Sequence, residues 1–174
     1  VVLGQVMSYN DVRWSSFWAS NGNRKKAPTA TELSVGKHVG EDPQRNRQHE
    51  TLGYVVFEAG GGELNGIPFH AALGADRIYG IFNTSSGYRY GQAGVQATST
   101  AVLSSAGMDG SDCGWPVLFG RNAVSNDQLI LVIEEDDIKD DERAHPSEQV
   151  AYIVFDTDGG SNFTGSTANK PNTA

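Results

Sequence analysis

An acidic run at residues 134–142 is the densest set of side chains that could do chemistry in this chain of 174 residues. A hard cation such as Ca²⁺ takes about six to eight oxygen ligands, so a loop with this many carboxylates could bind calcium. The ligands that we expect for such a site are Glu135, Asp137, Asp140 and Asp141. The run lacks the spacing of an EF-hand loop, and a solvated acidic loop between two strands is the alternative. Calcium is the one cofactor that the sequence suggests.

Histidine precedes glutamate at two places, as His49 and Glu50 in the first half of the chain and as His145 and Glu148 in the second. Metal binding or acid–base catalysis could use such pairs, but a catalytic site rarely occurs twice in similar surroundings. Each histidine also lies two residues after an arginine and shortly before an apolar strand. A histidine bonded to a backbone carbonyl and a glutamate paired with arginine would fix the loop against that strand. We therefore interpret these four residues as structural.

Other signals of an enzyme are weak. The chain has no Gly-x-Ser-x-Gly motif, no phosphate-binding loop and no His-Glu-x-x-His motif. Glycoside hydrolysis needs only two carboxylates, so an acidic chain does not exclude it, but nothing in the sequence supports it. We expect a protein that is not an enzyme.

Aromatic and amide side chains beside turns give the stronger indication of function. A sugar ring has an apolar face of C–H groups and a rim of hydroxyls, so aromatic planes stack on the face while polar groups bond the rim. The residues that we expect to bind such a ligand are Tyr9, Asn10, Trp18, Tyr88 and Tyr90. The sequence therefore predicts a polysaccharide or glycan as the partner.

Much of the first half of the chain recurs in the second. Tyr54 and Phe57 recur as Tyr152 and Phe155, 98 residues later (152 − 54 and 155 − 57). The structural histidines should then lie at matching strand entrances, and the two tyrosines should point into the same layer. Trp14 and Trp115 also occupy corresponding positions. We interpret this pair as core residues, because tryptophan is usually largely buried.

The repeat predicts the organisation of the fold. Each half contains a strand, a turn, a tryptophan segment, a strand, an acidic loop and a strand, at about residues 1–59 and 101–157, with a Gly-rich connection at 60–100. Short apolar runs between turns, with Gly 21 and 38% hydrophobic residues, indicate an all-β fold, a β-sandwich built from two pseudo-repeated halves. Residues 1–158 are expected to form one domain, and the polar residues 159–174 a flexible linker or tail.

Charge and hydropathy limit the partners. A net charge of −8 argues against nucleic acid and anionic membranes, since phosphate binding relies on basic patches. No apolar run approaches the roughly 20 residues of a spanning helix, so we expect no membrane insertion. The single cysteine, Cys113, cannot form an internal disulfide. Because residue 1 is Val1 and no signal peptide precedes it, we expect a mature or excised piece of a protein that is secreted or exposed at the cell surface.

Part of the sequence resembles a known kind of repeat. Tyr9 and Asn10 near the start, an acidic loop, and then His145-x-x-Glu148-x-Val-x-Tyr152 are similar to repeats in large secreted and surface proteins of bacteria. Those repeats accompany carbohydrate-active and adhesion modules. The pattern also resembles the H-type lectins, small six-stranded β-sandwiches that bind sugars. The first half departs from it by bringing histidine and glutamate together. The resemblance implies no catalytic residues.

Two functions fit these observations. The preferred one is a secreted, non-catalytic module that binds a polysaccharide or glycan. The alternative is a self-assembling structural subunit of a surface adhesin or an extracellular filament, whose partners are copies of itself and whose aromatic residues are buried between subunits.

Overall fold

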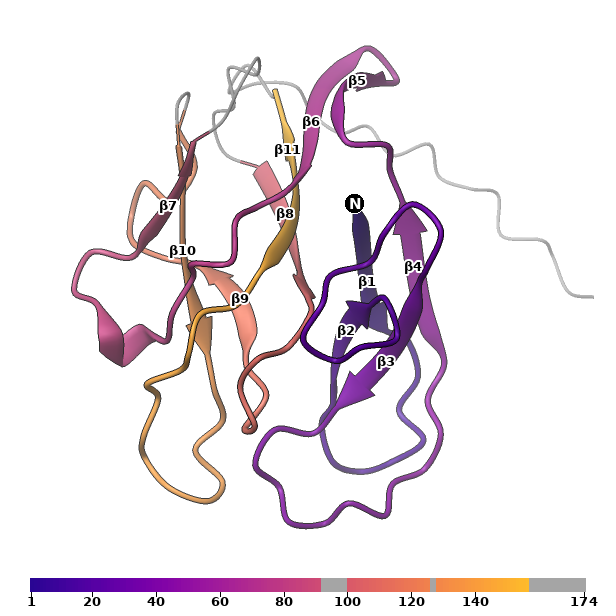
Figure 1. The fold of residues 1–174 in the computed structure, drawn as a ribbon, viewed down its shortest axis with the longest axis vertical. Helices are drawn as coiled ribbons and strands as arrows, with labels where there is room; N and C mark the ends of the chain where they lie inside the picture. Colours follow the sequence, from indigo (N-terminus) through magenta and orange to yellow (C-terminus); the bar gives the residue numbers. More distant parts are fainter. Residues whose placement is uncertain (92–99, 126–127, 157–174) are drawn as a thin grey trace, which may run out of the picture.

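The computed structural model describes residues 1–91, 100–125 and 128–156, and nearly all regular structure in them is β-strand. The largest sheet has six strands in the order β3 (Ser34–His38), β2 (Ser16–Ser20), β8 (Thr100–Ala106), β11 (Val150–Phe155), β6 (Ile67–Leu73) and β5 (Gly60–Leu64). A three-stranded sheet has the order β7 (Tyr88–Gly91), β10 (Gln128–Glu134) and β9 (Trp115–Leu118). A two-stranded sheet pairs β1 (Val2–Val6) with β4 (Leu52–Val56). The expected all-β, sandwich-like fold is confirmed (Figure 1).

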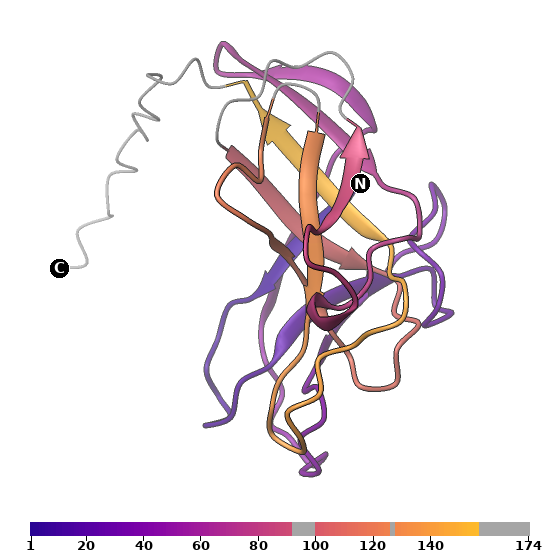
Figure 2. The ribbon, with the colours of Figure 1, turned by 90° about the vertical axis from the view of Figure 1, so that its left-hand side faces the viewer.

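Strand β11 lies at the centre of the packing. Alternate residues of a strand point to opposite faces, and both faces of β11 are covered. On one face, Val150 and Tyr152 pack against Leu131 of β10, while on the other Ile153 packs with Leu3 of β1. The other two sheets therefore lie on opposite faces of the six-stranded one, and Figure 2 shows β8 and β11 crossing β10 obliquely. Every residue of β11 is buried.

The two halves use the same pattern of pairing. In the first half, the last strand returns antiparallel to the first, with Tyr54 opposite Gly4. In the second half, β11 returns antiparallel to β8, with Tyr152 opposite Leu103. The two middle strands of each half also pair with each other, as β2 with β3 and β9 with β10. A short parallel pairing of β2 with β8 joins the halves.

Residues 60–91 are more than a connection. Strands β5 and β6 form a hairpin that extends the six-stranded sheet, and β7 extends the three-stranded one. The hairpin turns at Asn65 and Gly66, whose φ angles are 52° and 81°. Two central residues with positive φ are typical of the tight turns that match the twist of a hairpin. A 3₁₀ turn, η1 (Ile81–Asn83), follows β6. Among the described residues, no helix is long and apolar enough to cross a membrane.

The matched tyrosines lie in different environments. Tyr54 is 49% exposed and Tyr152 is 4% exposed, although each sits at the corresponding position of its strand pair. Strand β11 has neighbours on both edges and layers on both faces, whereas β4 pairs with β1 alone among the described strands. The expectation that both tyrosines point into the same buried layer is therefore wrong.

This asymmetry predicts unequal costs of truncation. Tyr152→Ala should lower the free energy of unfolding by about 3–5 kcal/mol, because it empties a site in the core. Tyr54→Ala, its matched control, should cost less than about 1 kcal/mol, as is usual at exposed positions. Urea unfolding of both variants and the parent measures the difference. Equal losses from the two substitutions would contradict the structure.

Candidate functional site

In each half, the side chain of one glutamate binds the backbone of the loop that follows the first strand. Glu50 accepts hydrogen bonds from the backbone N–H groups of Asn10, at 3.0 Å, and Asp11, at 2.9 Å. Glu148 accepts them from Asp109 and Gly110, at 2.8 Å each. The two glutamates precede β4 and β11, the last strands of their halves. Both glutamates thus hold a loop, but they do so through backbone N–H groups and not through the arginine that the sequence predicts.

In the second half, a buried histidine supports the glutamate. The Nε2 atom of His145 lies 2.8 Å from an oxygen of Glu148, and its Nδ1 atom contacts Glu135. Burial alone would lower the pKa of His145, but the hydrogen bonds to Glu148 and Glu135 outweigh burial and raise it. Burial raises the pKa of Glu135. His145 therefore tends to carry a proton between the two carboxylates.

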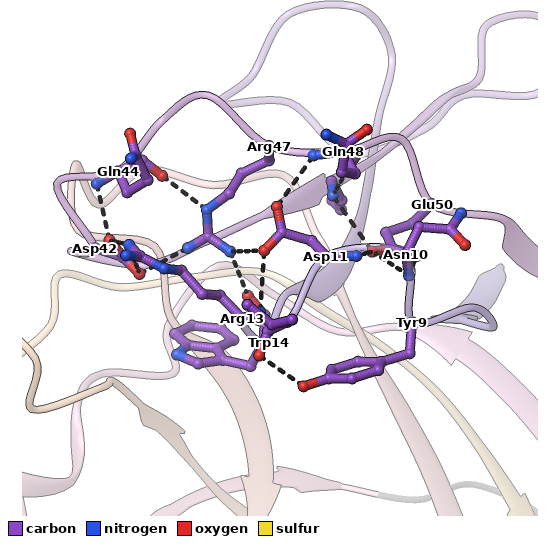
Figure 3. Close-up of polar contacts among 12 residues, drawn as sticks. Tyr9, Asn10, Asp11, Arg13, Trp14, Asp42, Gln44, Arg47, Gln48 and Glu50 are labelled. Atoms are coloured by element: carbon purple, nitrogen blue, oxygen red, sulfur yellow. Dashed lines mark hydrogen bonds and ion pairs between the residues drawn. The ribbon is translucent and has the colours of Figure 1, made fainter.

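In the first half, a nearly buried arginine binds residues of the loops around the glutamate rather than the glutamate itself. The side chain of Arg47 is 5% exposed and lies 2.8 Å from Asp42 and 3.6 Å from Asp11 (Figure 3). It also donates to the carbonyl oxygen of Trp14, at 3.3 Å. Arg47 thereby ties two loops together and fixes the backbone that carries a tryptophan.

His49 does not match His145. It is exposed, and its described contact is through its carbonyl oxygen, which accepts from the Asn10 side chain at 2.7 Å. Neighbouring residues in an extended segment point to opposite sides, so a histidine next to Glu50 points away from it. In the second half, Pro146 and Ser147 separate His145 from Glu148, and this spacing lets the His145 ring reach the Glu148 carboxylate. The prediction that the two histidines play the same role is wrong.

The five residues expected to bind a ligand do not gather in one place. Tyr9 and Asn10 lie in the loop held by the first glutamate, where the Tyr9 hydroxyl donates to the Val12 carbonyl oxygen at 2.7 Å. Trp18 lies on β2 and Tyr88 on β7, in different sheets. Tyr90 is 5% exposed and stacks on Tyr152 in the core, so its assignment as a binding residue is wrong.

A cavity of about 570 Å³ lies between the two halves instead. It lies where the starts of β2 and β9 meet the end of β10 and the loop that follows it. Its lining comes from both halves and comprises Trp14, Ser16, Trp115, Glu134, Glu135, Asp136, Asp137 and Arg143. We refer to it as the inter-half cavity.

The matched tryptophans form a wall of the inter-half cavity. The rings of Trp14 and Trp115 are in edge contact, with centroids 5.3 Å apart and planes at 68°. Both are only partly buried, so their assignment to the core is wrong. The edge of His38 supports Trp14 at 6.2 Å. Burial lowers the pKa of His38 to about 4, so this histidine is neutral at pH 7.

The carboxylates of the cavity differ in their partners. Glu134 pairs with Arg143, whose Nε atom lies 2.5 Å from it. Asp136 accepts from the backbone N–H groups of Glu41, at 2.9 Å, and Ile138, at 3.0 Å. Asp137 is exposed beside them. The site offers aromatic faces next to hydrogen-bond acceptors, a combination suited to an amphipathic ligand.

The four carboxylates expected to bind calcium are not brought together. Glu135 faces His145, and Asp140 accepts from the backbone N–H of Glu142 at 3.0 Å. Within residues 1–91, 100–125 and 128–156, no group of three or more His, Cys, Asp or Glu side chains is placed to hold a metal ion. Local backbone hydrogen bonds thus occupy part of the acidic run, and the calcium prediction is wrong in this structure.

Sequence reasoning missed the residues that define the cavity, chiefly Trp14, Trp115, Asp136 and Arg143. The signal was present, because the two tryptophans and the arginines before each histidine are matched between the halves. Matched residues of a duplicated fold can meet at the junction of its halves as well as in two equivalent cores. Only the tertiary structure distinguishes these outcomes.

Comparison with known proteins gives no match: no family model, curated protein or solved structure is similar to this chain.

The glutamate of the first half predicts a pH dependence. The backbone N–H of Asn10 and the Ser8 hydroxyl lower the pKa of Glu50 below its usual 4.5. A folded-state pKa below the unfolded one stabilises the fold above the unfolded pKa, and this contribution is lost as pH falls through the folded pKa. Glu50→Gln should therefore be less stable than the parent at pH 7, and the two stabilities should converge as the pH falls below 4.5 and through the lowered pKa of Glu50. A difference that stays constant from neutral to acidic pH would contradict this role.

Proposed function

We propose that this protein is a non-catalytic module that binds a polysaccharide or glycan in the inter-half cavity. The observation that carries the proposal is the contact of Trp14 and Trp115 in the wall of a cavity lined by carboxylates. The C–H face of a sugar packs on an aromatic plane, and its hydroxyls donate to carboxylate oxygens. The volume lies within the range of about 300–1,000 Å³ that small-molecule sites occupy.

The surroundings make the site rigid. Arg47 holds the backbone of Trp14, and His38 supports its ring. Asp136 is oriented by two backbone N–H groups. A binding site whose groups are held before the ligand arrives loses less conformational entropy on binding. A secreted or cell-surface location accompanies this proposal, as the resemblance to surface repeats implies.

Tryptophan substitutions test the proposal. Trp14→Ala and Trp115→Ala should each weaken binding at least about 10-fold on affinity electrophoresis against a panel of plant, algal and microbial polysaccharides, because buried aromatic anchors dominate such interfaces. Trp18→Ala is the matched control, since Trp18 lies on β2 and does not line the cavity. Its binding should be unchanged. Failure of the parent to bind any polysaccharide of the panel would refute the function.

One observation favours self-assembly as a second function. Strand β4 exposes apolar side chains, with Val55 52% and Val56 61% exposed, and carries no charge or proline. Met7 bonds to Thr51 and Phe57 bonds to Val1 through backbone groups, which fixes the register of β1 against β4. In an antiparallel pair, hydrogen-bonded and non-hydrogen-bonded residue pairs alternate. Val56, opposite Val2, is in a non-hydrogen-bonded pair, so its N–H and C=O groups point away from β1. An exposed apolar strand edge is a template for pairing with another copy.

Charging this edge tests self-assembly. If copies pair through β4, sedimentation should show an association that strengthens with protein concentration, and Val56→Lys should abolish it. Val12→Lys is the control, because Val12 is 80% exposed in a loop outside the strand. A parent protein that is monomeric at every concentration would exclude this function.

A further inference from the structure

We propose that the inter-half cavity selects a glycan that carries a protonated amine, as in a polymer of glucosamine. This inference rests on the proposed glycan-binding function and adds the chemical class of the ligand. Two independent features of the cavity support it, the balance of charges in its lining and the aromatic wall.

The lining has an excess of negative charge. Four carboxylates, Glu134 to Asp137, face one guanidinium, Arg143. The hydrogen bond that Arg143 donates to Glu134 is the main reason why the pKa of Arg143 is raised. This ion pair neutralises the charge of Glu134. It also engages Arg143, the cation among the lining residues, so that Arg143 is not free to bind a ligand.

The other three carboxylates differ in how far nearby groups neutralise their negative charge. Glu135 contacts His145, which can supply the balancing proton. The described partners of Asp136 are neutral backbone N–H groups, which orient its carboxylate without cancelling its charge. Asp137 is exposed, and among the described residues no hydrogen bond or close ion pair occupies its carboxylate, although Arg143 attracts it at longer range. His38 behind the wall is neutral at pH 7, because burial lowers its pKa to about 4, and so adds no compensating charge.

The aromatic wall favours a cation for a separate reason. The face of a tryptophan ring carries negative electrostatic potential, and an ammonium group within about 6 Å of the ring is attracted to it. Trp14 and Trp115 stand in the same cavity as Asp136 and Asp137. An ammonium substituent on a sugar ring could reach a carboxylate while the C–H face of the ring packs on tryptophan. Uronates and sulfated sugars, by contrast, would be repelled by the uncompensated carboxylates.

The experiment compares two oligomers with the same backbone and length. One is an oligomer of β-1,4-linked glucosamine, and the other is its fully N-acetylated, neutral form. Calorimetric titration at pH 6 should show that the amine form binds at least about 10-fold more tightly. Raising the NaCl concentration from about 20 to about 300 mM should reduce this preference, since salt screens exposed charges.

Substitution of one exposed carboxylate locates the effect. Asp137→Asn should lower the affinity for the amine oligomer about 5–10-fold more than it lowers the affinity for the neutral oligomer, because the amide keeps an acceptor oxygen but loses the charge. Asp137 is exposed, so this change is compatible with folding. Asp141→Asn is the matched control, because Asp141 belongs to the same acidic run but does not line the cavity. Its binding should equal that of the parent.

The outcomes separate the two proposals. Equal affinity for both oligomers would overturn the selection of an amine and leave glycan binding intact. Binding of the amine oligomer that survives both Trp14→Ala and Trp115→Ala would overturn the inference as well, since it would arise from general charge attraction outside the cavity. Absence of binding to these oligomers and to every polysaccharide of the panel would refute the proposed function itself.

Discussion

Both halves of the molecule depend on a glutamate that binds the backbone of a loop. The loop after the first strand turns across the end of a sheet, where its N–H groups have no strand to pair with. Glu50 and Glu148 accept those bonds, and each stands shortly before the last strand of its half. A buried N–H group left unpaired costs about 1–3 kcal/mol, which applies to the buried bond from Gly110, whereas the bonds from Asn10 and Asp11 lie nearer the surface. In both halves the carboxylate links the end of the first strand to the start of the last.

The support around the two glutamates differs, and the difference shapes the site. In the second half, His145 bridges Glu148 to Glu135, at the end of β10. In the first half, the Ser8 hydroxyl donates to Glu50, while Arg47 separately binds Asp42 and the carbonyl oxygen of Trp14. Of these residues, Arg47 directly fixes a tryptophan segment, through the carbonyl oxygen of Trp14. Residues outside the cavity thus position Trp14, Glu135 and Asp136, whereas Glu134 is paired with Arg143 inside it.

The strands and the glutamates could be predicted from sequence, because apolar runs between turns and a repeated Glu before a strand are local patterns. The positions of side chains from distant parts of the chain relative to one another could not be predicted in this way. Tyr90 has polar neighbours in sequence, yet it packs on Tyr152 and occupies space that a side chain at Gly74 would fill. The parallel pairing of β2 with β8 decides that Trp14 and Trp115 meet, and no local pattern encodes that pairing. The acidic run indicated calcium by composition alone, whereas the geometry of its loop directs the carboxylates to different partners.

The most direct test of the account is to observe the three tryptophans of the chain separately while an oligosaccharide binds. Each indole N–H gives its own resonance in a ¹H–¹⁵N spectrum, and single substitutions assign the three signals. Titration with the glucosamine oligomer should shift the signals of Trp14 and Trp115 in parallel and leave that of Trp18 in place. A titration that moves only Trp18, or that shows binding while the signals of Trp14 and Trp115 stay fixed, would contradict the claim that the inter-half cavity is the binding site.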